Sequence, residues 1–189
     1  QADLGALFPG AKLTPELLGK VYAVAYNDKL SLDERGEQMK ALMGVQGGQL
    51  VKRTICIWDP IGKSGPIFQA AMDQKTRAQS FGIDLNMVPY TDETIATVDL
   101  KAGRCDAALI SGLRARTLNK FTGTTDAIGG ITSDKEMRTL LYVLSRPAMA
   151  PKMVQGPFVT LGIAQGGAAF VFVNDKNINT LGKAAGKKV

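Results

Sequence analysis

The chain has 189 residues, of which 45% are hydrophobic and 21% are charged, a balance typical of a globular chain that forms one sizeable domain or two small ones. It contains no histidine, which excludes Ser-His and Cys-His catalysis and the commonest sets of zinc ligands. The net charge of +6 is compatible with anionic ligands. However, the basic residues are spread along the chain without a nucleic-acid-binding motif, so we expect no nucleic-acid partner. No apolar run approaches the roughly 18 residues that cross a bilayer.

The first part of the chain, residues 1–46, is predicted to be helical. Residues 14–16 (Thr-Pro-Glu) place an N-cap hydroxyl before a first-turn proline and an acid, and apolar residues follow at helical spacing. Residues 31–34 (Ser-Leu-Asp-Glu) form a capping box, which predicts a second helix that runs to residue 43. The glycine-rich residues 47–50 are interpreted as a linker.

From residue 51 onward, apolar runs rich in β-branched residues alternate with helical patterns. This order predicts strands at 53–58, 83–90 and 106–110, with helices at 67–80, 92–102 and 113–121. Such a series is typical of the α/β class, with a doubly wound, mostly parallel sheet covered by helices on both faces. Further along, the pattern predicts a helix at 135–149, strands at 159–163 and 168–173, and a last helix at 178–185. We therefore expect a sheet of about five strands.

The two cysteines, Cys56 and Cys105, are both placed in predicted strand regions. They are compatible with two buried thiols that behave as small apolar residues, and equally with one structural disulfide formed in an oxidising compartment. If the two strands are neighbours, a bridge would close a long loop and add about 4 kcal/mol of stability. The residues alone leave both alternatives open.

Two candidate site residues, Trp58 and Asp59, stand at the carboxyl end of the first predicted strand. Open α/β sheets bind ligands at that edge, so we expect Asp59 to accept hydrogen bonds from a ligand. The indole of Trp58 is suited to stacking on a ligand, and equally to packing in the core with its N–H group satisfied locally.

The turn that follows, Gly62, Lys63, Ser64 and Gly65, resembles part of a phosphate-binding loop. The full pattern needs a glycine five positions before Gly62, where Ile57 stands, so we do not expect nucleotide hydrolysis. A glycine-rich turn before a helix still offers backbone N–H groups that hold anions, with Ser64 as a possible cap. The alternative is a plain helix-capping turn.

A second candidate group, Ser111, Gly112, Arg114 and Arg116, follows the third predicted strand. The planar guanidinium fork suits a carboxylate or phosphate better than the point charge of lysine does. Either arginine is also able to pair with a surface acid. Residues 91–93 (Thr-Asp-Glu), after the second strand, are predicted to cap the next helix rather than to contact a ligand.

These residues supply no nucleophile with an adjacent base, so they indicate a binding protein rather than an enzyme. We predict neither a cofactor nor a metal site. The alternative is an enzyme that acts on a small phosphorylated or carboxylated metabolite, with Lys63 or Asp59 as the polar catalyst. A third hypothesis is an interaction module that docks a partner on its helical N-terminus.

Four segments together resemble a family of extracytoplasmic solute-binding proteins. They are CIWDPIGKSG, YTDETIATVDLKAGRCD, RARTLNKFTGTTDAIG and VFVNDKNINTLGKAAGKKV, and the resemblance extends over residues 52–189. The family is similar to the receptors of TRAP-type and ABC-type uptake systems, which have the type II periplasmic-binding-protein fold. The resemblance implies a periplasmic protein that captures a small organic anion for a membrane transporter component. It also implies an oxidising compartment, which favours a disulfide between Cys56 and Cys105.

The resemblance also predicts an unusual order of segments. Residues 51–189 are similar to the first, ligand-binding lobe, and their last residues, 186–189, resemble the segment that enters the second lobe. Residues 1–46 resemble the helical segment that normally comes last and packs on that same lobe. The hypothesis is therefore a single lobe, either circularly permuted or with its segments out of order and the other lobe absent.

Overall fold

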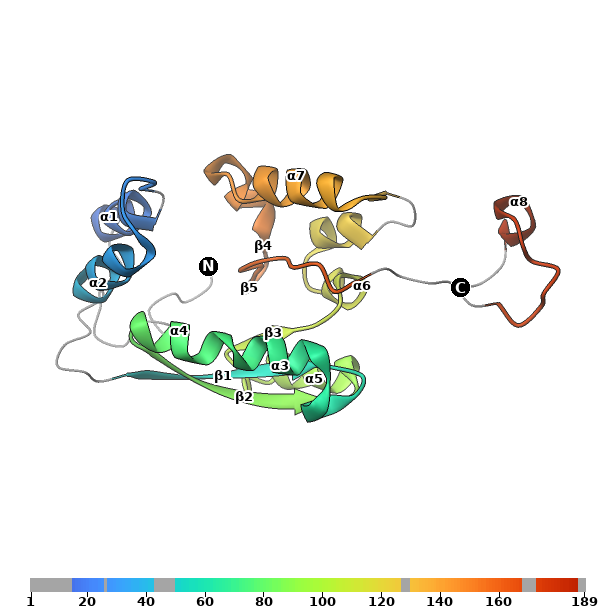
Figure 1. Cartoon of the computed structure of the whole chain (residues 1–189), viewed down its shortest axis with the longest axis horizontal. Coiled ribbons are helices and arrows are strands. Elements are labelled where there is room, and N and C mark those ends of the chain that lie inside the picture. The colour runs from blue at the N-terminus through green and yellow to red at the C-terminus, as the bar shows by residue number, and fades with distance from the viewer. Residues whose placement is uncertain (1–14, 26, 43–49, 127–129, 168–172, 187–189) are drawn as a thin grey trace.

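A computed structural model of the chain describes residues 15–25, 27–42, 50–126, 130–167 and 173–186, and Figure 1 shows how the elements are arranged. At the centre of the α/β part is a parallel sheet with the strand order β2-β1-β3. Its strands are β1 (Val51–Trp58), β2 (Ile83–Tyr90) and β3 (Ala107–Leu109). The three predicted strands and their parallel pairing are confirmed, and the α/β class with them.

Each connection between consecutive strands of the parallel sheet contains helices. The connection from β1 to β2 contains α3 (Pro66–Met72) and α4 (Gln74–Ser80), and the connection from β2 to β3 contains α5 (Glu93–Lys101). Because β2 and β3 flank β1 on opposite sides, right-handed crossovers place α5 and the α3–α4 pair on opposite faces of the sheet. In Figure 1 the α3–α4 pair runs along one side of the sheet.

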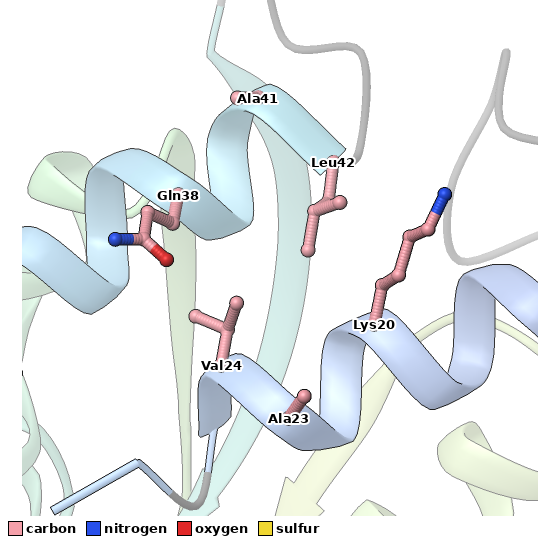
Figure 2. A pocket seen from close by; sticks show the side chains of 6 residues that line it. All are labelled: Lys20, Ala23, Val24, Gln38, Ala41 and Leu42. Carbon is pink, nitrogen blue, oxygen red and sulfur yellow. The ribbon is translucent and has the colours of Figure 1, made fainter.

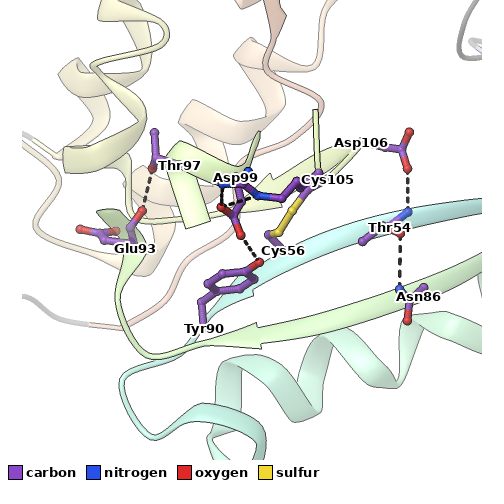
Figure 3. The surroundings of a disulfide bond; sticks show 10 residues. Thr54, Cys56, Asn86, Tyr90, Glu93, Thr97, Asp99, Cys105 and Asp106 are labelled. Atoms are coloured by element: carbon purple, nitrogen blue, oxygen red, sulfur yellow. Dashed lines mark hydrogen bonds and ion pairs between the residues drawn. A yellow bond between two sulfur atoms is a disulfide. The ribbon is translucent and has the colours of Figure 1, made fainter. Parts of the chain in front are cut away.

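A small core surrounds a disulfide between Cys56 and Cys105, whose Cα atoms are 5.9 Å apart (Figure 3). Both cysteines and Ala96 of α5 are buried, and Tyr90 and Ile110 pack against them. The residue after Cys105 strengthens the same junction. Asp106 donates its backbone N–H to the Thr54 carbonyl (2.8 Å) and accepts the Thr54 N–H on its carboxylate (2.7 Å). The start of β3 is therefore fixed to β1 by one covalent bond and two hydrogen bonds.

Polar contacts lie between this core and the solvent. The Tyr90 hydroxyl donates to Asp99 Oδ2 at 2.6 Å, and Arg104 donates from Nε to Asp99 Oδ1 at 2.9 Å. The hydrogen bond to Asp99 raises the pKa of Tyr90, and the hydrogen bond from Arg104 lowers the pKa of Asp99. These contacts tie the end of β2 to the end of α5.

Three of the helices predicted between residues 67 and 149 differ from the observed ones. The helix predicted at 67–80 is divided at Asp73 into α3 and α4. The helix predicted at 113–121 is replaced by the single turn α6 (Gly112–Ala115) and the 3₁₀ helix η3 (Lys120–Asp126). In this region threonine hydroxyls donate to carbonyls three residues earlier, a local alternative that competes with the α-helical pattern.

The third difference lies after residue 134. Helix α7 (Asp134–Leu144) begins at the N-cap Ser133, but it ends before Pro147 and is followed by the 3₁₀ helix η4 (Pro147–Met153). Arg146 has extended backbone angles (φ −72°, ψ 142°), as is expected for a residue that precedes proline. The prediction that the helix continues to 149 is therefore wrong.

The C-terminal part contributes less regular structure than predicted. An antiparallel pair, β4 (Val154–Gln155) and β5 (Phe158–Val159), surrounds Gly156, whose φ is +58°. The strand predicted at 159–163 ends at Val159, and most of the one predicted at 168–173 lies outside the described residues. Helix α8 (Leu181–Ala184) is shorter than the predicted 178–185. Among described residues the parallel sheet thus has three strands rather than five.

Two helices at the N-terminal end form a hairpin, α1 (Pro15–Ala25) and α2 (Leu32–Leu42). The predicted capping box is confirmed, because the Ser31 N–H donates to Glu34 Oε2 (2.7 Å) and the Glu34 N–H donates to Ser31 Oγ (3.2 Å). Gly36 of α2 is buried beside the ring of Phe81, which follows α4. The hairpin therefore contacts the α/β part, while most of the predicted linker lies outside the described residues.

None of the helices in the described parts of the chain is long and apolar enough to cross a membrane.

Removal of the disulfide is expected to destabilise the protein strongly. The cysteines are 49 positions apart, so the double variant Cys56→Ala/Cys105→Ala should lose about 4 kcal/mol of unfolding free energy. Urea unfolding at neutral pH measures this loss. The wild type should fall to a similar value when a reductant is added, whereas the variant should not respond. A wild type that keeps its stability in reductant would contradict the expectation.

Substitution of Gly36 tests the contact between the helical hairpin and the α/β part. A Cβ at this position would lie 3.2 Å from two carbons of the Phe81 ring, so Gly36→Leu should cost about 1–3 kcal/mol and increase hydrogen exchange in α2 and α4. The matched control is Gly19→Leu in α1, which gains the same helix propensity in open space. Equal stabilities of the two variants would argue against the contact.

Candidate functional site

The candidate residues lie at the carboxyl ends of the parallel strands. The chain passes from β1 to β2 at one edge of the sheet, and then from β2 back past β1 to β3 at the other edge. The topological switch point of the sheet therefore lies between β1 and β3. Open α/β sheets bind ligands at such a point. The loops after β1 and β3 carry the two predicted groups of site residues.

The carboxylate of Asp59 is fully buried, with 0% of the residue exposed. Its Oδ1 accepts the Ile61 N–H at 2.9 Å, and its Oδ2 accepts the N–H groups of Ile67 (2.8 Å) and Phe68 (3.0 Å). Burial alone opposes ionisation, but the three donated hydrogen bonds outweigh it and lower the pKa of Asp59. Asp59 therefore occupies the N-terminus of α3 as an internal anion, with no exposed surface to offer a ligand.

The turn after Asp59 is shaped by its glycines. Gly62 has a φ of +76° and donates its N–H to the Asp59 carbonyl at 2.8 Å, and Gly65 donates to the Gly62 carbonyl at 2.9 Å. Gly65 is the N-cap of α3 and leaves room for the Asp59 carboxylate. The expectation that Ser64 caps this helix is therefore wrong.

The remaining residues of this first group are more accessible. Lys63 and Ser64 are exposed, and Trp58 is half-buried at the end of β1, where it pairs in register with Tyr90 of β2. The ammonium group of Lys63 makes no ion pair with another described residue. Lys63 is thus the group in this loop that is best placed to meet an anion.

After β3, the predicted Ser111 and Arg114 are brought together with Glu93 and Thr94 of α5. Ser111 caps α6, because its Oγ accepts the Arg114 N–H at 3.1 Å, and its own N–H donates to Glu93 Oε2 at 3.0 Å. Arg114 donates from Nη2 to Thr94 Oγ1 at 3.0 Å. The Arg114 Nε lies 3.8 Å from Glu93 Oε1, which is an ion-pair distance but too long for a hydrogen bond.

The Nε of Arg114 is therefore a buried donor that has no hydrogen-bond partner among the described residues, and it is the only buried side-chain nitrogen or oxygen there of which this is true. The side chain as a whole is 35% exposed. Buried polar groups are nearly always paired, so this guanidinium N–H is suited to donate to an acceptor from outside the described residues.

The other two predicted residues of this group lie against η3. Gly112 faces the carboxylate of Asp126, because a Cβ on Gly112 would lie 2.3 Å from Asp126 Oδ2. Arg116 is exposed, its stem packs beside Gly123, and it makes no ion pair with a residue that the structure describes. Arg116 thus lies against η3, and its side chain makes no hydrogen bond or ion pair with Glu93, Thr94, Ser111 or Arg114, all of which the structure describes.

Thr94 was not among the predicted site residues, and Glu93 was predicted to cap a helix rather than to contact a ligand. The cap prediction itself is confirmed for Asp92, whose Oδ1 accepts the Thr94 N–H at 2.7 Å and whose pKa this hydrogen bond lowers. Their position in the chain could have identified Glu93 and Thr94. The first turn of a helix that follows a parallel strand lies at the carboxyl ends of the strands, close to the loop that follows the next strand.

Away from this edge, a pocket of about 460 Å³ lies between α1 and α2 (Figure 2). It is lined by Lys20, Ala23, Val24, Gln38, Ala41 and Leu42. The lining is mostly aliphatic, and none of the predicted site residues contributes to it. No cluster of three or more potential metal ligands occurs in the described ranges.

Comparison with known proteins connects the chain to solute-binding proteins. The sequence profile of the family described as solute-binding protein AdeT 1/2 matches residues 74–189. The chain is also 49% identical over 133 residues to the probable solute-binding protein AdeT1 of Acinetobacter baumannii, which covers 70% of this chain and 44% of that relative. The chain thus spans less than half of the relative's length. No solved structure matches the chain.

Gly65 is expected to accept no side chain while Asp59 caps α3. The backbone angles of Gly65 (φ −78°, ψ 157°) suit any residue, but a Cβ would lie 1.9 Å from Asp59 Oδ1. Gly65→Ala should therefore lower the unfolding free energy by about 1–3 kcal/mol, measured by thermal or urea unfolding. Gly162→Ala, where a Cβ meets open space, is the control. Unfolding transitions that coincide for the two variants would contradict this geometry.

Proposed function

The chain belongs to the family of solute-binding proteins AdeT 1/2, and we propose that it captures a small organic anion at the carboxyl ends of β1 and β3. The family and the related protein point to binding rather than catalysis. The rival hypothesis of an enzyme also loses one of its two candidate catalysts, because the Asp59 carboxylate is buried and occupied by backbone N–H groups.

The main support for an anionic solute is the Nε–H group of Arg114, which has no hydrogen-bond partner among the described residues. A carboxylate or phosphate oxygen accepts hydrogen bonds from a guanidinium in a planar, directional arrangement. The exposed Lys63 and Arg116 add positive charge in the loops after β1 and β3. The backbone N–H groups of Ile67 and Phe68 do not take part in this proposal, since Asp59 already accepts from them.

We place this activity outside the cytoplasm, in the periplasm, with delivery of the solute to a membrane transporter component. The buried disulfide between Cys56 and Cys105 supports export, because such bonds persist in oxidising compartments. In this proposal residues 51–189 form one lobe of a type II periplasmic-binding-protein fold. The helical hairpin of α1 and α2 packs on the same lobe, in a chain that is either circularly permuted or has its segments out of order and the other lobe absent. The contact of Gly36 with Phe81 supports that packing.

Binding of anions by the protein is tested with simple probes. Isothermal titration of the full chain with benzoate and with inorganic phosphate, and with neutral benzamide as the matched compound, measures affinity and charge selectivity. Arg114→Ala should weaken binding of the preferred anion about ten- to a hundredfold, because a hydrogen bond to a charged group is lost. Arg138→Ala, which removes an exposed arginine of α7, should leave the affinity unchanged. Equal affinity for benzoate and benzamide would overturn the anionic solute.

A further inference from the structure

The loops after β2 and β3 are linked by one carboxylate. Glu93 is the first residue of α5, and its Oε2 accepts the Ser111 N–H at 3.0 Å across a sequence separation of 18 positions. The side chain of Glu93 is 19% exposed, so solvent screens this contact only in part. Glu93 is thereby held in one orientation at the edge of the sheet.

The second carboxylate oxygen of Glu93 makes a much weaker contact. Oε1 lies 3.8 Å from Arg114 Nε, close enough for charge attraction but too far for a hydrogen bond. The guanidinium is positioned from its other end, because Nη2 donates to Thr94 Oγ1 at 3.0 Å. Arg114 is therefore held by two neighbouring residues of α5, and one buried donor remains unused.

We propose that Glu93 is a positioning residue for solute binding. It acts as an internal counter-anion that holds Arg114 in place until the anionic group of a solute takes over as the hydrogen-bond partner of Nε. This inference rests on the proposed function. Because the Ser111 N–H holds Oε2, Glu93 does not move close enough to Arg114 to accept a hydrogen bond from Nε. A solute therefore has to replace only a charge attraction between Glu93 and Arg114. Glu93 thus sets how tightly an anion binds, although it carries the same sign of charge as the solute.

Glu93→Gln is expected to bind an anion more tightly than the wild type does. The glutamine keeps an acceptor for the Ser111 N–H but removes the competing negative charge. The dissociation constant for an anion should therefore fall, by up to about fivefold, as befits a partly exposed ion pair. A purely structural role of Glu93 predicts an unchanged or weaker affinity. Glu93→Ala, which also removes the acceptor for Ser111, should bind less well than Glu93→Gln.

The experiment follows the arginine Nε–H resonances of the nitrogen-15-labelled full chain during titration with inorganic phosphate and, separately, with benzoate. The Arg114 resonance, assigned by its loss in Arg114→Lys, should move toward a hydrogen-bonded position in the wild type and saturate at lower probe concentration in Glu93→Gln. The matched control is Glu136→Gln. This residue also caps a helix start, accepting from the Thr132 N–H at 2.8 Å, and its substitution should not change the affinity.

The two hypotheses fail in different ways. If other resonances respond to a probe while that of Arg114 does not, or if Glu93→Gln fails to tighten binding, the role of Glu93 is overturned and anion binding stands. If no resonance of the wild type responds to either probe, the proposed anion binding itself is overturned, and the role of Glu93 with it. Thermal unfolding of each variant shows whether it is folded. Glu93→Asp, which keeps the charge and should not tighten binding, serves as the second variant.

Discussion

The bond between Cys56 and Cys105 is the constraint on which the position of the candidate site depends. Strand β3 has three residues and pairs with β1 at three register positions, so its own ladder supplies few hydrogen bonds. The disulfide and the two hydrogen bonds between Asp106 and Thr54 fix where this short strand begins. Ser111 and Arg114 follow only a few residues later, and their meeting with Glu93 requires β3 to stay in register.

The protein's own carboxylates fill the positions at which sheets of this kind often hold anions. Asp59 accepts from the first N–H groups of α3, Asp92 from the first turn of α5, and Glu93 from the N–H of Ser111. Backbone donors that are already paired add little to recognition of a solute, so in the proposed site the choice between solutes depends on side chains. In the proposed site the guanidinium of Arg114 therefore contributes more to anion binding than the glycine-rich turn does.

The sequence predicted best what local signals determine. The three parallel strands, the capping box of α2 and the cap of α5 followed from residues within a few positions of one another. The helices predicted at 113–121 and 135–149 failed where threonine hydroxyls and Pro147 favoured 3₁₀ turns. The contact of Glu93 with Ser111 could not be predicted locally, because it depends on which strands are neighbours. The burial of Asp59 has a different, local cause, the turn in which Gly62 has a positive φ and the Asp59 carboxylate accepts from Ile61, Ile67 and Phe68.

The close approach of Gly65 to Asp59 also bears on how this family can vary. The carboxylate fills the volume that a side chain at position 65 would need, so position 65 accepts a side chain only when the acid at position 59 is absent. A lineage that lost the acid at 59 would release the constraint at 65 and at the same time leave two helix-start N–H groups without an acceptor. The pair Asp59–Gly65 is thus an ordered constraint, in which the carboxylate at position 59 must be lost before or together with the gain of a side chain at position 65.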